Sequence, residues 1–191
     1  MSETKSTTGA SVWKNVFSGR NVQKGSTEEL LSKVPAFKML SPRELKEVAA
    51  IVHKREYRAG EPIFYQGDPG LGMYIIQDGS VSITIAGKDG EQQELVMLSE
   101  GDFFGELALL DESPRSANAV CKGDCSLIGF FRPDLFDLIE KKTSLGIKIV
   151  LQLAEIVAMR LRNTDKEVSK MKESSEKMEA ELEVLRKKEA S

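Results

Sequence analysis

The spacing of apolar residues changes twice along the 191-residue chain, from a helical period to a period of two and back to a helical period. Residues 26–56 follow helical spacing, and the segments STEELLSKVPAF and SPRELKEVAAIV each begin with a Ser that can cap a helix. In the second segment, Ser41 is followed directly by Pro42 and then by Glu44, which is typical of a first helical turn. The pattern therefore predicts two short helices between residues 26 and 56.

Between residues 57 and 131 the spacing changes to a period of two, which is typical of half-buried strands. The pairs Asp78-Gly79 and Asp89-Gly90 tolerate the positive φ angles of tight hairpin turns. Short runs separated by such turns leave room for about eight strands and favour a closed roll over an open sheet. The sequence thus predicts a mainly β fold with flanking α-helices, built on an eight-stranded antiparallel jelly-roll β-barrel.

Residues 1–25 are rich in Ser, Thr, Gly and Lys, a composition that buries too little apolar surface to offset the entropy of ordering. We expect a flexible N-terminal tail there. Within it, the segment SVWKNVF has four residues spaced to share one helical face: Val12, Trp13, Val16 and Phe17. This face could dock on the chain's own domain or on a partner, and the sequence leaves both interpretations open.

After Pro133 helical spacing returns and continues to the C-terminus. A heptad register with Ile147 at position a places apolar residues at most a and d positions, as a coiled coil needs. Opposite charges would meet in a parallel, in-register pair, Glu167 with Lys172 and Glu181 with Arg186. We therefore expect a long C-terminal helix that forms a parallel coiled coil, and hence a homodimer, over residues 146–191. A single solvated helix is the alternative.

Charge and composition narrow the classes of partner. The chain has 27 Lys and Arg against 30 Asp and Glu, so bulk electrostatics disfavour nucleic acid and we expect no DNA partner. It has no long apolar run and no apolar signal-peptide core, so we expect no membrane partner and a cytoplasmic location. In that location we expect reduced thiols at Cys121 and Cys125. We expect no metal, because their spacing of four is not that of a CxxC site and only His53 is available elsewhere.

The segment GDFFGELALLDESPRSANAV, residues 101–120, places a carboxylate and a guanidinium close together in apolar sequence. Glu106 and Arg115 could form a structural ion pair, or they could share a ligand with a hydroxyl at one end and an anion at the other. A cyclic nucleotide has both groups. Backbone amides after Gly105 and the permanent charge of Arg115 would suit its phosphate, and Glu106 would suit its ribose hydroxyl.

Four segments occur in an informative order along the chain: AGEPIFYQGD, YIIQDGSV, FGELALL and PRSANA. The last two resemble the phosphate-binding cassette of the cyclic nucleotide-binding domain family, and the first two resemble its earlier strand and glycine-turn motifs. The resemblance spans about Leu30 to Val168 and implies an eight-stranded jelly roll flanked by helices. It implies that Glu106 holds the ribose hydroxyl and Arg115 the cyclic phosphate. Other cassette residues are implied to contribute: Gly105, Leu107, Ala108, Ser116 and Ala117.

Two positions bear on the choice of base. Family members that prefer cGMP often have threonine directly after the cassette arginine, where this chain has Ser116, so the resemblance favours cAMP and leaves cGMP open. The segment LAEIVAMRLRNTDKEV is similar to the dimer helix of the bacterial catabolite activator, in which a threonine at the position of Thr164 reaches the adenine amino group. Alternatively, Thr164 is a polar residue tolerated at a d position. We expect no counterpart of that activator's DNA-binding domain.

The sequence thus predicts a tail at 1–25, a cyclic nucleotide-binding domain at 26–145, and a C-terminal helix with a coiled coil at 146–191. We expect a non-enzymatic regulatory module that binds cAMP, dimerises and signals to a separate effector protein by a rearrangement of helices. A nucleotide-independent dimeric adaptor with the same fold is the alternative. An enzyme is disfavoured because jelly-roll metalloenzymes need several inward His ligands and the chain has only His53.

Overall fold

The computed structural model describes residues 26–87 and 91–189, with side chains up to residue 179. The tail predicted at residues 1–25, with its SVWKNVF segment, lies outside the described residues, and so does the predicted Asp89-Gly90 turn.

In the part of the chain that the structure describes, three short helical elements precede the strands: α2 (Thr27–Lys33), the 3-10 helix η1 (Pro35–Phe37) and α3 (Pro42–Ala49). The hydroxyl of Ser26 caps α2 by accepting a hydrogen bond from the backbone N–H of Glu29 at 3.3 Å. Ser41 and Glu44 form a capping box on α3, in which the Glu44 carboxylate accepts from the Ser41 N–H at 2.8 Å. These caps satisfy donors that a helix start leaves without partners, and they confirm the predicted starts of both α-helices.

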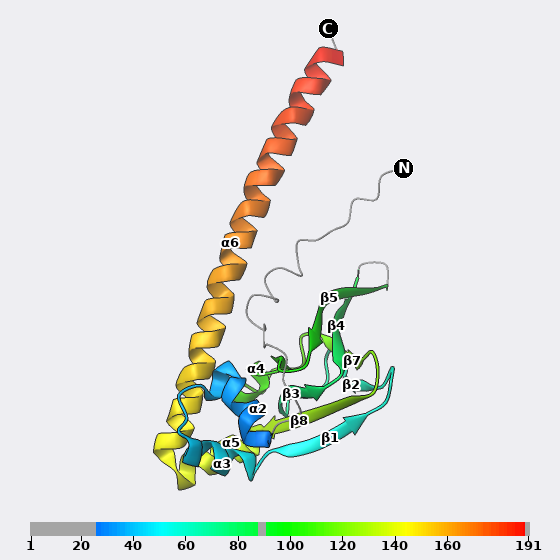
Figure 1. Cartoon of the computed structure of the whole chain (residues 1–191). Coiled ribbons are helices and arrows are strands. Elements are labelled where there is room, and N and C mark those ends of the chain that lie inside the picture. Colours follow the sequence, from blue (N-terminus) through cyan, green and yellow to red (C-terminus); the bar gives the residue numbers. More distant parts are fainter. Residues whose placement is uncertain (1–25, 88–90, 190–191) are drawn as a thin grey trace. The chain divides into compact units, whose positions relative to one another are not determined.

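Eight strands follow within residues 53–87 and 91–131, and they pair antiparallel in two four-stranded sheets. The strand order is β1-β8-β3-β6 in one sheet and β2-β7-β4-β5 in the other. Figure 1 shows the long antiparallel pair of β1 and β8. The bounds of the strands are β1 His53–Tyr57, β2 Pro62–Phe64, β3 Gly72–Asp78, β4 Ser80–Ala86, β5 Gln92–Ser99, β6 Phe103–Phe104, β7 Asn118–Cys121 and β8 Cys125–Phe131.

The prediction of one closed barrel is wrong, because the described strands form two sheets with edges of their own. The turn at Asp78-Gly79 also differs from the predicted hairpin. The strands on either side of it, β3 and β4, belong to different sheets, so the chain crosses from one sheet to the other at Gly79. Gly79 has a φ of 93°, and a Cβ there would lie 2.6 Å from the carbonyl oxygen of Asp124. Turn signals predict strand ends, but they do not predict which strands exchange hydrogen bonds.

One apolar core joins the strands to the helices on both sides of them in the sequence. Phe130 of β8 is fully buried, and its ring meets that of Phe37 edge-on at 5.8 Å. Helix α5 (Arg132–Lys141) follows β8 directly and adds the buried Leu135 to this core. The first turns of α6 (Thr143–Glu189) add four more buried residues: Leu145, Ile149, Leu153 and Ile156. The helices that follow the strands therefore share one apolar core with them.

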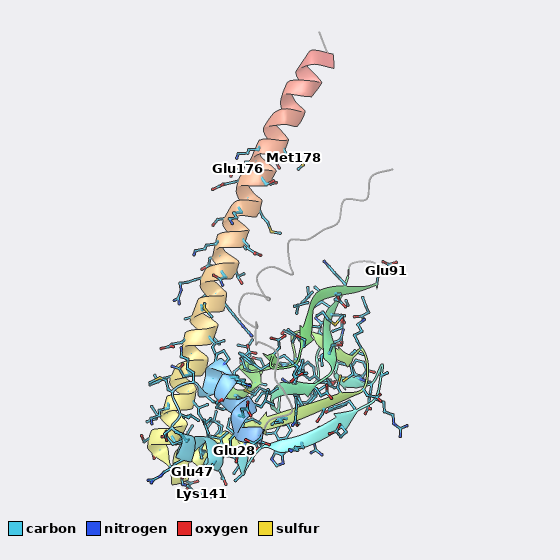
Figure 2. All side chains as sticks on the ribbon, viewed as in Figure 1. Glu28, Glu47, Glu91, Lys141, Glu176 and Met178 are labelled. Carbon is cyan, nitrogen blue, oxygen red and sulfur yellow. The ribbon has the colours of Figure 1, made fainter. Side chains whose placement is uncertain are left out.

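Several large apolar residues of α6 remain exposed. The chain divides into two compact units between Ile156 and Val157, and each unit contains part of this helix. In the first unit Ile147 is 48% exposed. The second unit exposes Leu161, Val168, Met171 and Met178, and Figure 2 shows Met178 projecting from the helix. Within the described residues, no helix combines the length and the apolar character that crossing a bilayer requires.

The Glu44 carboxylate connects the capping box of α3 to the start of α6. It accepts a hydrogen bond from Lys148 Nζ at 2.7 Å, and its side chain is only 20% exposed. The bond from Lys148, together with those from Ser41, lowers the pKa of Glu44 from 4.5 to about 2. Because the folded pKa lies below the unfolded one, ionised Glu44 stabilises the fold above pH 4.5, and this stabilisation is lost as the pH falls towards 2.

We expect Glu44→Gln to lower the free energy of unfolding by about 1 kcal/mol at neutral pH, since one partly buried ion pair is lost. The difference from the wild type should shrink steadily as the pH falls from 4.5 towards 2. Urea unfolding over this pH range measures it. Glu91→Gln, at an exposed position, is the control and should match the wild type throughout. A loss that stays constant with pH would show that charge is not the cause.

Candidate functional site

The cassette begins where β6 ends. Gly105 follows Phe104 with a φ of 75°, in the left-handed region that glycine adopts without strain. A Cβ at this position would lie 2.5 Å from Arg115 Nη1 and 3.2 Å from the carbonyl oxygen of Gly72. Glycine therefore lets the chain turn towards α4 (Leu107–Leu110) while Arg115 approaches the backbone closely.

Arg115 is held by both its side chain and its backbone. Its side chain is buried, and Nη1 donates a hydrogen bond to the carbonyl oxygen of Gly105 at 3.2 Å. The guanidinium carbon lies 4.1 Å from the centroid of the Phe64 ring, so the cation stacks on an aromatic face. The Arg115 N–H donates to the carbonyl of Asp68 at 2.8 Å, and the Arg115 carbonyl accepts from Gly67 N–H at 2.9 Å. The loop after β2 thus fixes the position of this residue.

The guanidinium of Arg115 carries an unused hydrogen-bond donor. Its Nε atom is buried and has no hydrogen-bond partner among the described residues. Burial lowers the pKa of Arg115, and the nearby Tyr74, Glu106 and Asp68 act in the opposite direction. Arginine nevertheless stays charged in proteins. A buried cation with a donor to spare suits an anionic ligand, because hydrogen bonds between charged groups are short and strong.

Glu106 lies between the Gly105 turn and α4, and only 2% of its surface is exposed. Its backbone carbonyl accepts a hydrogen bond from Leu109 N–H at 3.0 Å, which holds it at the start of the short helix. Its carboxylate is close enough to Arg115 to influence the pKa of the guanidinium. An ionised carboxylate can only accept hydrogen bonds, so this group suits a ligand hydroxyl. The structure therefore brings Gly105, Glu106 and Arg115 together, as the sequence predicts.

The other predicted site residues differ in exposure. Leu107 is 46% exposed, Ser116 is exposed and Ala117 is partly buried. Ala108 is buried, and its N–H donates to the carbonyl of Gly105 at 3.2 Å. Thr164 belongs to the second compact unit, on α6, where its side chain is exposed.

Sequence reasoning missed the residues that support Arg115 from the strands. Phe64 lies under the guanidinium and belongs to an aromatic cluster with Tyr74 and Phe104. Gly70 lets the loop after β2 approach α4, since a Cβ there would lie 2.8 Å from the Ala108 Cβ. The motif AGEPIFYQGD marks this strand and the start of the loop, but no local pattern pairs Phe64 with an arginine so distant in the sequence.

The described residues contain no group of three or more His, Cys, Asp or Glu side chains that could hold a metal ion. Cys121 and Cys125 are free and buried. Burial, followed by a hydrogen bond with Cys125, raises the pKa of the Cys121 thiol to about 12. At neutral pH this thiol is therefore protonated and unreactive.

Several known proteins are similar to this chain. A model of the family described as cyclic nucleotide-binding domain matches residues 54–142. The cyclic AMP receptor protein of Thermus thermophilus is 37% identical over 134 residues, which are 70% of this chain and 60% of that protein. The type II regulatory subunit of cAMP-dependent protein kinase from Drosophila melanogaster is 37% identical over 110 residues, which are 58% of this chain and 29% of that protein.

A solved structure supports the same relationship. The crystal structure of the Thermus thermophilus catabolite activator protein matches with a TM-score of 0.66 and 36% identity, and the match covers 72% of this chain and 63% of that one. The chain thus spans less than two thirds of each of these relatives. The segment that the family model matches contains the eight described strands, except for the first residue of β1, and also the Gly105 turn, Glu106 and Arg115. Residues 54–142 therefore form a domain that belongs to the cyclic nucleotide-binding domain family.

Proposed function

We propose that the chain is a non-enzymatic regulatory module that binds a cyclic nucleotide at Arg115 and Glu106, with cAMP as the ligand. One observation carries this proposal: the buried guanidinium of Arg115 keeps an unpaired Nε donor beside the Gly105 turn, within electrostatic reach of Glu106. Arg115 donates to the cyclic phosphate, and Glu106 accepts from the ribose 2′-hydroxyl. Each of these hydrogen bonds involves an ionised protein group, which makes it stronger than a neutral one.

The remaining cassette residues complete the phosphate end of the site in this proposal. The Ala108 N–H already donates to the Gly105 carbonyl, so Ala108 contributes by packing. The backbone N–H of Leu107 and the hydroxyl of Ser116 are the additional donors, and the exposure of both residues supports this role. Ala117 leaves room for the sugar because its side chain is small.

The choice of cAMP over cGMP rests on two observations. Ser116 stands where threonine would favour cGMP, and the relatives described above are a cyclic AMP receptor protein and a subunit of a cAMP-dependent kinase. The contact of Thr164 with the adenine amino group stays a prediction from the sequence. Titrating the protein with cAMP, cGMP and 5′-AMP tests the proposal, and we expect the tightest binding for cAMP. Tighter binding of cGMP would contradict the proposed adenine base. Equal binding of 5′-AMP would contradict the proposed recognition of a cyclic phosphate.

The proposed domain comprises residues 26–145, with the C-terminal helix and coiled coil at 146–191 and the tail at 1–25. We propose that the two sheets form a jelly roll. The strand orders β1-β8-β3-β6 and β2-β7-β4-β5 support this, because successive strands change sheet at every step except the β4–β5 hairpin, as they do in interleaved Greek keys. Ligand would then bind beside the sheet that contains β6.

We propose that α6 forms a parallel coiled-coil homodimer. Exposed apolar residues at the predicted a and d positions support it: Leu161, Val168, Met171 and Met178.

Sedimentation equilibrium should therefore give twice the 21.1 kDa mass of the chain. The double variant Val168→Glu/Met171→Glu should shift the protein to monomer, because it buries unpaired charge in the seam. Lys170→Glu, at a c position, should remain dimeric. A monomeric wild type would contradict the coiled coil.

Signalling is proposed to run from the cassette into α5. The Arg132 N–H at the start of α5 donates to the Leu71 carbonyl at 2.9 Å, and the Arg132 guanidinium pairs with Glu112 at 3.5 Å. Glu112 lies between α4 and Arg115 in the sequence, so a ligand that moves the cassette acts directly on this helix. Ligand can shift the helix only by its differential affinity for the two positions.

A nucleotide-independent adaptor remains the second candidate, favoured by the exposed apolar stripe of α6, which needs no ligand. Hydrogen exchange of the backbone amides of α5, with and without cAMP, distinguishes the two candidates. Changed protection on addition of cAMP supports sensing. Identical exchange in both conditions supports the adaptor.

A further inference from the structure

Arg115 is positioned by an aromatic ring as well as by hydrogen bonds. Its guanidinium carbon is 4.1 Å from the centroid of Phe64, a contact distance for a cation on a ring face. The side chain is buried, so this attraction acts in surroundings where solvent weakens it little. Its described hydrogen bond, from Nη1 to the Gly105 carbonyl, uses one of five donors.

A ring face positions a guanidinium in a way that a carboxylate cannot. The N–H groups of arginine lie in one plane and point outward at its edge. A carboxylate binds at that edge and therefore competes with a ligand phosphate for the same donors. An aromatic ring stacks on the flat face, attracts the positive charge and leaves the edge available. Phe64 therefore orients Arg115 and consumes none of its donors.

The ring itself is held in place by its neighbours. Phe64 ends β2 and pairs with Ala119 of β7, the strand that follows the cassette. Its ring centroid lies 5.9 Å from that of Phe104, the residue immediately before Gly105, and 6.2 Å from that of Tyr74. Tyr74 and Phe104 stack on each other at 5.7 Å with an interplanar angle of 22°. The aromatic cluster thus connects both ends of the cassette to the surface on which the guanidinium rests.

We infer that Phe64 is a positioning residue of the nucleotide site: its ring face aims the free edge of the Arg115 guanidinium at the anionic group of the ligand. This inference rests on the proposed binding of a cyclic phosphate at Arg115. Strand β2 would thus contribute to ligand affinity through Phe64, although this residue lies far from the cassette in the sequence.

Substitutions at Phe64 test the inference by calorimetric titration of the full chain with cAMP. Phe64→Leu should weaken binding about tenfold, because the cation–π attraction and the fixed orientation are both lost. Phe64→Tyr keeps a ring face and should restore affinity to within about twofold of the wild type. Phe130→Leu is the matched control, since it removes a buried ring from the same core, and this ring meets Phe37 edge-on and has no described contact with Arg115. It should bind cAMP like the wild type.

A second variant with a ring of nearly the same shape keeps the test valid if Phe64→Leu does not fold. Replacing Phe64 by 3,4,5-trifluorophenylalanine keeps the ring but withdraws electron density from its face, so it should also weaken cAMP binding. A structural role for the ring would leave affinity unchanged in this variant. Wild-type affinity in both the leucine and the trifluorinated variants overturns the inference, and so does an equal loss in Phe130→Leu.

A spectroscopic signature tests the stack without any ligand. In ¹⁵N-labelled full chain, the Arg115 Nε–H resonance, assigned by its loss in Arg115→Lys, should be shifted by the ring current of Phe64 and protected by burial. The shift should vanish in Phe64→Leu and persist in Phe130→Leu. If the stack is present but the wild type binds no cyclic nucleotide, the proposed function fails on its own. If the wild type binds cAMP and the resonance does not respond to Phe64, the inference fails and the proposed function stands.

Discussion

Replacing Arg115 with alanine is expected to weaken cAMP binding at least about 100-fold. The substitution removes the buried cation that would oppose the cyclic phosphate, and breaking one side of a buried charge pair costs about 3–5 kcal/mol. The loss should be this large because Arg115 is enclosed: its backbone is tied to Gly67 and Asp68, and its side chain to Gly105. No flexible surface arginine could substitute for it. Calorimetric titration of the variant with cAMP measures the change.

Two further variants make the Arg115 result specific. Arg43→Ala removes an exposed arginine from α3 and should leave the dissociation constant unchanged. Arg115→Lys keeps the charge but loses the planar fork of donors, so it should bind between the wild type and the alanine variant. Affinity that is unaltered in Arg115→Ala, in a protein that melts normally, would show that the phosphate binds elsewhere.

Glu106→Gln is expected to weaken cAMP binding about tenfold to a hundredfold. The carboxylate accepts from the ribose 2′-hydroxyl, and hydrogen bonds to charged groups contribute about 1.5–3 kcal/mol. The glutamine keeps the size of the side chain at this buried position, so the change tests charge more than packing. Removing the partner hydroxyl should have the same effect, and 2′-deoxy-cAMP should therefore bind wild type and variant almost equally. The measurement is a thermodynamic cycle of four dissociation constants, for wild type and Glu106→Gln, each with cAMP and with 2′-deoxy-cAMP.

The same cycle separates the two explanations of the Glu106 and Arg115 pair. If the acid serves only to neutralise the arginine, Glu106→Gln lowers the free energy of unfolding, and the 2′-hydroxyl changes affinity equally in both proteins. If Glu106 binds the sugar, the effects of the variant and of the deoxy ligand are not additive. Additive effects would therefore contradict the proposed role of the carboxylate.

The cassette and the helix starts were predictable because their signals are local. A Ser41 followed by Glu44 three residues later can satisfy backbone donors only at a helix start, and the structure has that capping box. Gly105, Glu106 and Arg115 lie within one short segment, so the chain limits their separation to about 35 Å, and the Gly105 turn and α4 bring them closer. The structure brings all three together.

The arrangement of the sheets was not predictable from the same signals. An Asp-Gly pair tolerates a tight turn, but the turn at Gly79 carries the chain between sheets because the adjacent strands find other partners: β3 pairs with β8 and β4 with β7. These pairings depend on which apolar faces can be buried together, and that is a property of the whole core. Phe64 was missed for the same reason, since its contact with Arg115 exists only after β2 has paired with β7.

The most direct test of the central claim is equilibrium dialysis of the full chain, refolded from urea to remove any carried nucleotide, against labelled cAMP. The buried Arg115 with its unpaired Nε, beside Glu106, predicts saturable binding of one cAMP per chain that unlabelled cAMP displaces and 5′-AMP does not. Absence of saturable binding at millimolar cAMP, in a protein with a cooperative melting transition, would contradict it.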